Sequence, residues 1–159
     1  MFKKILVPLD GSELAGKILP NVVEMAKCMN AQVTLLHVCY FPVATGAEVA
    51  PHKMQQEAES QELKWCDTFL GAAAKEVGKE GLDVAYECVE GVPAREIIAY
   101  ADTNGIDLIA MATHGKGEVA WVLGSTAEKV VTHATVPTLL YRVIETTPPA
   151  LKVMASGMP

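Results

Sequence analysis

Five short apolar runs recur along the chain and divide it into regular segments. They are KILVPL (4–9), VTLLHV (33–38), DVAYECV (83–89), DLIAMA (107–112) and TLLYRV (138–143). Four are rich in β-branched or aromatic residues, and several are continuous, which is typical of strands buried on both faces of a parallel sheet. The run 83–89 alternates more cleanly, as expected of an edge strand.

Between these runs, apolar residues recur at helical spacing. The pattern predicts helices over 13–30, 53–80, 93–103 and roughly 125–135. Pro20 lies inside the first of these and should kink the helix or mark a shortened first turn. Because strands and helices alternate throughout, we expect an α/β fold: a single-domain, open five-stranded parallel sheet with helices on both faces.

The size and charge of the chain limit its class. A chain of 159 residues, half of them hydrophobic, is large enough to bury one core and is not disordered except at its ends. The net charge is −6, and the 13 lysines and arginines are scattered along the sequence. An acidic domain without a basic face is a poor partner for nucleic acid or an anionic membrane, so we expect neither.

The cysteines and the amino terminus indicate the compartment. Cys28, Cys39, Cys66 and Cys88 form no CxxC pair and have no histidine at zinc-finger spacing. We therefore expect small buried hydrophobic residues with free thiols. The first apolar run is too short for a signal peptide or a membrane span. Together these features favour a cytoplasmic location.

The segment MATHGKGEVAWVLGSTAEKVV (111–131) carries the main candidate chemistry. It leads from an apolar strand through a glycine-bearing loop into a helix, where backbone N–H groups can form an anion site. Ser125 and Thr126 place hydroxyls at the helix start. The segment is either a phosphate-binding loop or an ordinary strand–helix connection with a serine cap.

A second segment, PLDGS, follows the first strand. In open parallel sheets, ligands bind at the carboxyl ends of the strands where the strand order reverses, so PLDGS and MATHG are expected to meet there. Asp10 either accepts hydrogen bonds from a ligand or forms a turn before the first helix.

Four motifs in this order resemble the universal stress protein family: ILVPLDGSE, LLHV, EGVPAREI and THG…LGSTAEKVVTHATVPTLLYR. The resemblance covers about residues 2–143. It implies a Rossmann-like fold, similar to the adenine nucleotide alpha hydrolases, that commonly dimerises through its last strand. It also implies a domain over 1–144. Residues 145–159 carry three prolines and little periodicity, so we expect a flexible tail there.

The family contains members that bind ATP and members that do not. The ATP-binding pattern is G-x-x-G, nine residues, then G-[ST]; here Ala112 replaces the first glycine and eight residues separate Gly115 from Gly124. Alanine is a mild replacement if φ is negative there, as expected at a strand end. Glu118, inside the shortened interval, would repel phosphates unless it turns outward or shares a Mg²⁺ ion.

The resemblance assigns nucleotide-contacting roles to eleven positions. His114 either donates to a phosphate or anchors the loop, and Lys116 either pairs with phosphate or is a surface lysine. By the resemblance, Asp10 contacts the nucleoside end of the ligand and the backbone of Val38 meets the adenine ring. Pro8 belongs to the same site. The full set is Pro8, Asp10, Val38, Met111, Ala112, His114, Gly115, Lys116, Gly124, Ser125 and Thr126.

The functional expectation is a cytoplasmic stress-response protein that binds ATP or another adenine nucleotide, with or without Mg²⁺, as a regulatory homodimer with an unidentified protein partner. No GxSxG elbow or Walker A sequence is present, and we assign no catalytic residue and no metal ligand. We expect at most slow, incidental ATP hydrolysis. The alternative is a nucleotide-free dimeric adaptor of the same fold. The dimer is expected to form through 138–143, because an edge strand exposes backbone groups.

Overall fold

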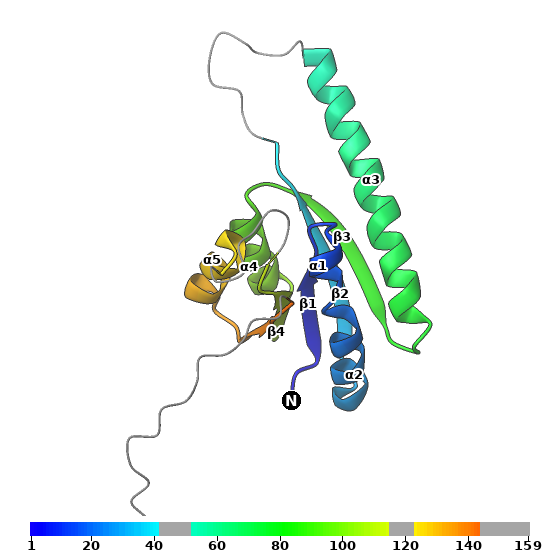
Figure 1. The fold of residues 1–159 in the computed structure, drawn as a ribbon, viewed down its shortest axis with the longest axis vertical. Helices are drawn as coiled ribbons and strands as arrows, with labels where there is room; N and C mark the ends of the chain where they lie inside the picture. Colours follow the sequence, from blue (N-terminus) through cyan, green and yellow to red (C-terminus); the bar gives the residue numbers. More distant parts are fainter. Residues whose placement is uncertain (42–51, 115–122, 144–159) are drawn as a thin grey trace, which may run out of the picture.

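A parallel sheet of five strands forms the centre of the computed structural model, which describes residues 1–41, 52–114 and 123–143 (Figure 1). The strands are β1 (Lys4–Pro8), β2 (Gln32–Cys39), β3 (Val84–Glu90), β4 (Leu108–Ala112) and β5 (Thr138–Tyr141). Their order is β3-β2-β1-β4-β5. All residues of β4 are buried, whereas β3 and β5 lie at the edges. The predicted fold class and the edge position of 83–89 are confirmed.

Helices connect the strands as the apolar periodicity predicts. They are α1 (Glu13–Gly16), α2 (Leu19–Met29), α3 (His52–Gly78), α4 (Pro93–Thr103) and α5 (Ser125–His133). The predicted helix over 13–30 is two helices, with Pro20 in the first turn of α2. Proline is tolerated there because the first N–H groups of a helix have no partner inside it.

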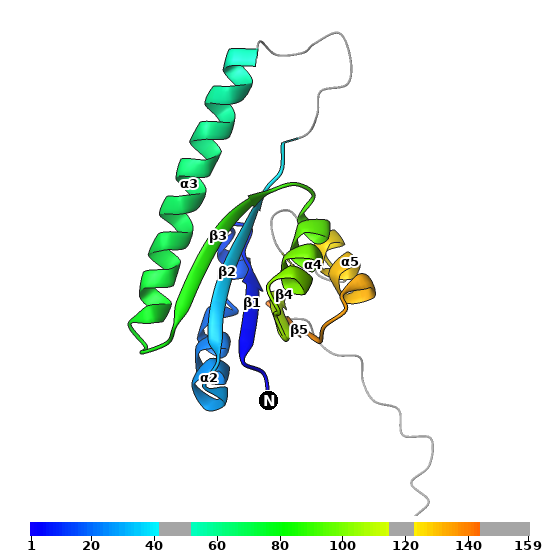
Figure 2. The same cartoon turned by 180° about the vertical axis from the view of Figure 1, so that it is seen from behind.

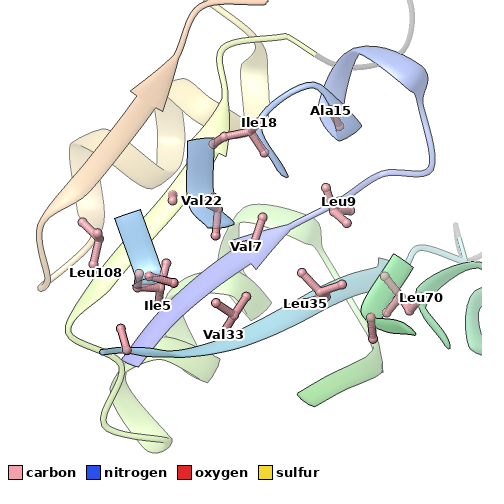
Figure 3. Close-up of a cluster of buried hydrophobic side chains, with 14 of the residues drawn as sticks. Ile5, Val7, Leu9, Ala15, Ile18, Val22, Val33, Leu35, Leu70 and Leu108 are labelled. Atoms are coloured by element: carbon pink, nitrogen blue, oxygen red, sulfur yellow. The ribbon is translucent and has the colours of Figure 1, made fainter. Parts of the chain in front are cut away.

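The two faces of the sheet are covered by different helices. The helices α2 and α3 lie on one face and α4 and α5 on the other (Figures 1 and 2). Alternate residues of each strand enter the two layers. In β1, Ile5 and Val7 pack with Val22 of α2 (Figure 3), while Leu6 packs with Ile97 of α4. Both layers are continuous apolar cores, so the sheet is fixed from both sides.

The strand order reverses between β1 and β4. The chain first adds β2 and β3 on one side of β1, then returns to add β4 and β5 on the other. At the amino ends, the Asp107 carboxylate accepts the backbone N–H groups of Lys3 and Lys4 at 2.9–3.2 Å. The reversal leaves a crevice at the opposite, carboxyl ends of β1 and β4, where the sequence places PLDGS and MATHG.

Two of the cysteines are not free. Cys66 of α3 and Cys88 of β3 form a disulfide, with Cα atoms 6.3 Å apart and a sequence separation of 22. The expectation of four free thiols is wrong for this pair, because α3 packs directly on β3 and brings distant positions together. Cys28 and Cys39 are free, and Cys28 is exposed rather than buried.

The described helices and the carboxyl-terminal segment bear on two further expectations, a membrane span and a flexible tail. Among the described helices, none is both long enough and apolar enough to cross a bilayer. The expected tail at 145–159 lies outside the described residues.

Candidate functional site

A cavity of about 230 Å³ lies at the carboxyl ends of β1 and β4. Its walls come from β1, β2, β4 and the starts of α1, α4 and α5. The lining residues are Pro8, Leu9, Asp10, Ala15, Leu36, His37, Val38, Pro93, Ile97, Met111, Ala112, Thr113, His114, Gly124, Thr126 and Ala127.

The cavity has an apolar wall and a polar rim. Leu36 and Met111 are buried and belong to the core beneath α4 and α5, and Val38 packs against that core. The Asp10 side chain, Thr126 and the beginning of α5 also line the cavity. A flat apolar ring fits the first region and groups that accept backbone N–H bonds fit the second.

Asp10 is held in a turn at the end of β1. Its Oδ1 accepts the Ser12 backbone N–H at 2.9 Å and the Ser12 hydroxyl at 2.5 Å. The Ser12 Oγ in turn accepts the Ala15 N–H at 3.1 Å and caps α1. The turn predicted as one alternative therefore exists, and the same residue lines the cavity. The two roles of Asp10 are compatible.

The beginning of α5 supplies backbone donors. Gly124 is the N-cap, and it has no side chain to bond the first N–H groups. The first bond of the helix runs from the Glu128 N–H to the Gly124 carbonyl at 2.8 Å, so the preceding N–H groups make no intrahelical bond. Since Thr126 and Ala127 line the cavity, this positive helix end lies beside it. The arrangement can bind an anion.

The alanine that departs from the ATP-binding pattern is accommodated without strain. Ala112 is the last residue of β4, and Asn30 is the only described non-glycine residue with positive φ. The φ of Ala112 is therefore negative, as expected, and the replacement of glycine costs no backbone energy here. The methyl group lines the cavity, and the residue is buried.

Thr113 and His114 fasten the loop after β4. Thr113 donates its N–H to the Tyr141 carbonyl at 2.9 Å, and its carbonyl accepts the Gly124 N–H at 3.0 Å. Its hydroxyl lies 2.8 Å from His114 Nδ1, and both side chains are buried. The anchoring alternative for His114 is therefore present, on a residue that also lines the cavity.

His37 enters the cavity wall from β2. Its Nδ1 lies 2.8 Å from the Leu9 carbonyl, and the residue is 7% exposed. The ring is therefore held by a backbone carbonyl, and the side chain also borders the cavity. Two residues further, burial raises the pKa of the Cys39 thiol, and the charges of Glu62 and Glu90 raise it further.

The structure brings together most of the predicted positions. Ser125 is the first residue of α5 and is exposed, whereas its two neighbours line the cavity. Gly115 and Lys116 lie outside the described residues, as do Gly117, Glu118 and Trp121. The predicted residues that line the cavity are Pro8, Asp10, Val38, Met111, Ala112, His114, Gly124 and Thr126.

Some lining residues were missed by sequence reasoning. Leu9 and Thr113 adjoin predicted positions at strand ends, so their neighbours were a usable signal. Pro93 and Ile97 begin α4 and reach the cavity only because that helix packs across β2 and β4. No local pattern in the sequence distinguishes them from ordinary core positions.

Comparisons with known proteins agree on one family. Residues 1–142 match the model of the universal stress protein family. Universal stress protein MJ0531 of Methanocaldococcus jannaschii is 33% identical over 144 residues, which is 89% of this chain and 83% of that protein. Universal stress protein YxiE of Bacillus subtilis is 31% identical over 148 residues, covering 89% of this chain and all of that protein.

Solved structures give the same result for the fold. The structure of MJ0577, also from Methanocaldococcus jannaschii, superposes with a TM-score of 0.80 at 29% identity, covering 92% of this chain and 99% of that one. More distant structures share the fold and hold nucleotides. One universal stress protein is solved with cAMP (TM-score 0.64, 18% identity), and one from Arabidopsis thaliana is solved with AMP (TM-score 0.63, 15% identity). These two cover 90% and 88% of this chain, and 98% and 91% of their own.

Proposed function

This chain belongs to the universal stress protein family, and from that premise we propose that it binds ATP or another adenine nucleotide between β1 and β4. The observation that carries the proposal is the juxtaposition of an apolar wall with the glycine-capped beginning of α5 in one cavity. A nucleotide has a flat base and an anionic phosphate chain, and each suits one of these two regions.

The chemistry of the lining residues orients the ligand. The base packs along Leu36, Val38 and Met111, and the phosphates lie at the beginning of α5. Asp10 would repel a phosphate, so its carboxylate accepts instead from the adenine amino group or a ribose hydroxyl. The family pattern adds Gly115 and Lys116 to the phosphate end.

The overall charge of −6 does not attract a phosphate group. Binding must rely on local backbone donors, which act over a short range at a helix end.

The distant structures with cAMP and AMP motivate the choice of adenine ligands. We further propose that the protein is a cytoplasmic stress-response dimer, joined through its last strand, whose nucleotide occupancy alters a surface for a protein partner. The domain over 1–144 acts as one unit in this proposal, and turnover of the nucleotide is slow or absent. Mg²⁺ is a candidate companion of the phosphates.

Calorimetric titration of nucleotide-free, metal-stripped protein with ATP, ADP and AMP, each with and without Mg²⁺, tests the proposal. We expect saturable binding with one ligand per chain. Ala112→Val places two more methyl groups in the cavity and should weaken binding at least about tenfold. The matched control is Ala85→Val, the same change at an exposed position of β3, which should bind normally.

Absence of binding heat for all three nucleotides at two temperatures would favour the nucleotide-free adaptor. Binding that Ala112→Val leaves unchanged would exclude this cavity as the site. Thermal unfolding of each variant separates lost binding from lost folding.

A further inference from the structure

A buried cluster of sulfur and nitrogen atoms lies where α3 packs on β2. One donor atom each from His37, Cys39 and Cys66 lies within 4.8 Å of the other two. The three residues are 7%, 1% and 0% exposed. Imidazole nitrogen and thiolate sulfur are the donors that zinc and similar metals prefer, and such a group is uncommon in an apolar core.

One ring nitrogen of His37 contacts a backbone carbonyl, which leaves the other for a metal ion. Its Nδ1 lies 2.8 Å from the Leu9 carbonyl, which can only accept, so Nδ1 carries a proton. The other nitrogen, Nε2, faces α3 and lies 3.7 Å from Glu62 Oε1. Metal-binding histidines are held in this way, with one ring N–H donated to a carbonyl and the other nitrogen toward the metal.

A fourth donor adjoins the cluster. Cys88 is paired in register with His37 across β2 and β3, and its sulfur is bonded to that of Cys66. Cleavage of this bond leaves Cys88 as a thiol beside the other three residues. The site then contains the three sulfurs and one nitrogen of a closed tetrahedral centre.

We propose that the reduced protein binds one thiophilic divalent ion, such as Zn²⁺, through His37, Cys39, Cys66 and Cys88, and that the disulfide is the metal-free state of the same site. A dithiol reductant supplies two electrons and two protons, becomes a disulfide itself, and leaves Cys66 and Cys88 as thiols. Zn²⁺ then displaces one proton to solvent from each of the three thiols.

Binding requires the four donor atoms to rearrange. Ligands about 2.0–2.3 Å from a tetrahedral zinc lie roughly 3.5–3.8 Å from one another. The donor atoms of His37, Cys39 and Cys66, now within 4.8 Å of one another, must therefore approach by about 1 Å. The sulfurs of Cys66 and Cys88, bonded to each other in the oxidised protein, must separate to about 3.8 Å once the disulfide is reduced. Cys88 is half-buried and Glu62 is partly exposed, which gives an ion a path from solvent.

The local charge also favours a cation. Glu62 Oε1 lies 3.7 Å from Nε2 of His37, at the edge of the cluster. A divalent ion at the cluster is attracted by this carboxylate. A buried site of this kind gains more from nearby charges than a solvated one does.

Cobalt(II) titration of the full chain tests the proposal, because cobalt replaces zinc and reports its ligands by absorption. The protein is reduced with dithiothreitol, freed of reductant without air, and titrated. We expect one cobalt per chain, intense thiolate-to-cobalt charge transfer, the visible bands of tetrahedral cobalt, and loss of colour on adding Zn²⁺. The oxidised protein should show none of these signals.

Variants assign the ligands. Cys39→Ala should weaken cobalt binding at least about tenfold and reduce the charge-transfer intensity. His37→Gln retains a side-chain N–H for the Leu9 carbonyl but removes the imidazole, so it should weaken binding and shift the visible bands. Cys28→Ser, which changes the exposed cysteine of α2, is the control and should match the wild type.

Three results would overturn the proposal: reduced wild-type protein that gives no charge-transfer band, equal binding before and after reduction, or equal binding by Cys39→Ala and wild type. Circular dichroism establishes that each variant is folded. If Cys39→Ala is unfolded, His37→Gln decides, since unchanged binding and spectrum there would also refute the site. Nucleotide binding plays no part in these readouts.

Discussion

The indole ring of Trp65 lies so close to Gly11 that a β-carbon on this glycine would be 2.3 Å from the ring atom Cη2. The ring is held between other aromatic groups: it stacks on Phe69 and meets His37 edge-on, with centroid distances of 5.2 Å in both cases. Trp65 thus links α3 to the turn that holds Asp10 and to the wall of the cavity.

The first prediction concerns this contact. Gly11→Ala should destabilise the fold by about 2–4 kcal/mol, because it adds a clash with the stacked Trp65 ring to the cost of a side chain at φ +77°. Gly81→Ala is the matched control: its φ is +80°, and nothing lies within 4 Å of an added β-carbon. It should cost only about 1–2 kcal/mol. Urea unfolding measures both.

Replacing the Trp65 ring tests whether its clash with residue 11 causes the loss of stability. In the Gly11→Ala background, Trp65→Leu should recover part of the loss, which a double-mutant cycle reports as a favourable coupling. Equal losses for the two alanine variants would mean that Trp65 moves aside at little cost.

Asp10→Asn separates the two roles of that residue. The asparagine Oδ1 can accept both bonds from Ser12, so the turn and the cap of α1 should survive and stability should change little. A ligand bonded to a charged carboxylate loses about 1.4 kcal/mol when the acceptor becomes neutral, which is about a tenfold lower affinity. Calorimetric titration with the proposed nucleotide measures this change in affinity.

The control for Asp10→Asn is Asp10→Ala, which removes the turn as well and should lower both stability and affinity. An unchanged affinity in Asp10→Asn would leave Asp10 with its structural role alone.

The edge strand β5 is the predicted dimer contact. Leu139 is 41% exposed on this strand, and a charge there should oppose pairing of two copies. Leu139→Arg should therefore shift a dimer to monomer in sedimentation velocity. Met54→Arg adds the same charge at an exposed residue of α3 and should leave the mass unchanged. A dimer that persists in Leu139→Arg would require another interface.

A surface ion pair gives a pH-dependent prediction. Lys27 Nζ lies 2.5 Å from Glu80 Oε2, and this hydrogen bond and charge lower the pKa of Glu80 below its ordinary 4.5. A lowered folded-state pKa stabilises the protein above pH 4.5, and the contribution disappears as the pH falls through the folded value. Glu80→Gln should therefore be slightly less stable than wild type at pH 7 and equally stable in strong acid.

Because both groups are exposed, salt should reduce that difference at pH 7. Urea unfolding at low and high ionic strength measures it. A difference that is independent of pH would point to lost packing instead.

Sequence patterns predicted the fold well because each pattern reflects a local physical requirement. The apolar runs identified the buried strands, and Pro20 marked the boundary that separates α1 from α2. The segments around Asp10 and Gly124 were found because glycines and short polar residues at strand ends are characteristic of such connections.

The sequence could not reveal contacts that depend on packing between elements. Cys66 and Cys88 are 22 positions apart and share no motif, so only the seating of α3 on β3 brings them together. The same holds for Ile97 at the cavity and for the approach of His37 to Cys39 and Cys66. Periodicity predicts that such residues are buried, but not what they contact.

The reversal of strand order determines when the cavity can form during synthesis of the chain. The cavity is lined by seven residues between Pro8 and Val38 and by nine that begin at Pro93 and end at Ala127. A ribosome must therefore synthesise most of the protein before β4 can lie beside β1 and close the site. Newly made fragments have no complete cavity, and any ligand that bridges its walls reports on finished, folded chains alone.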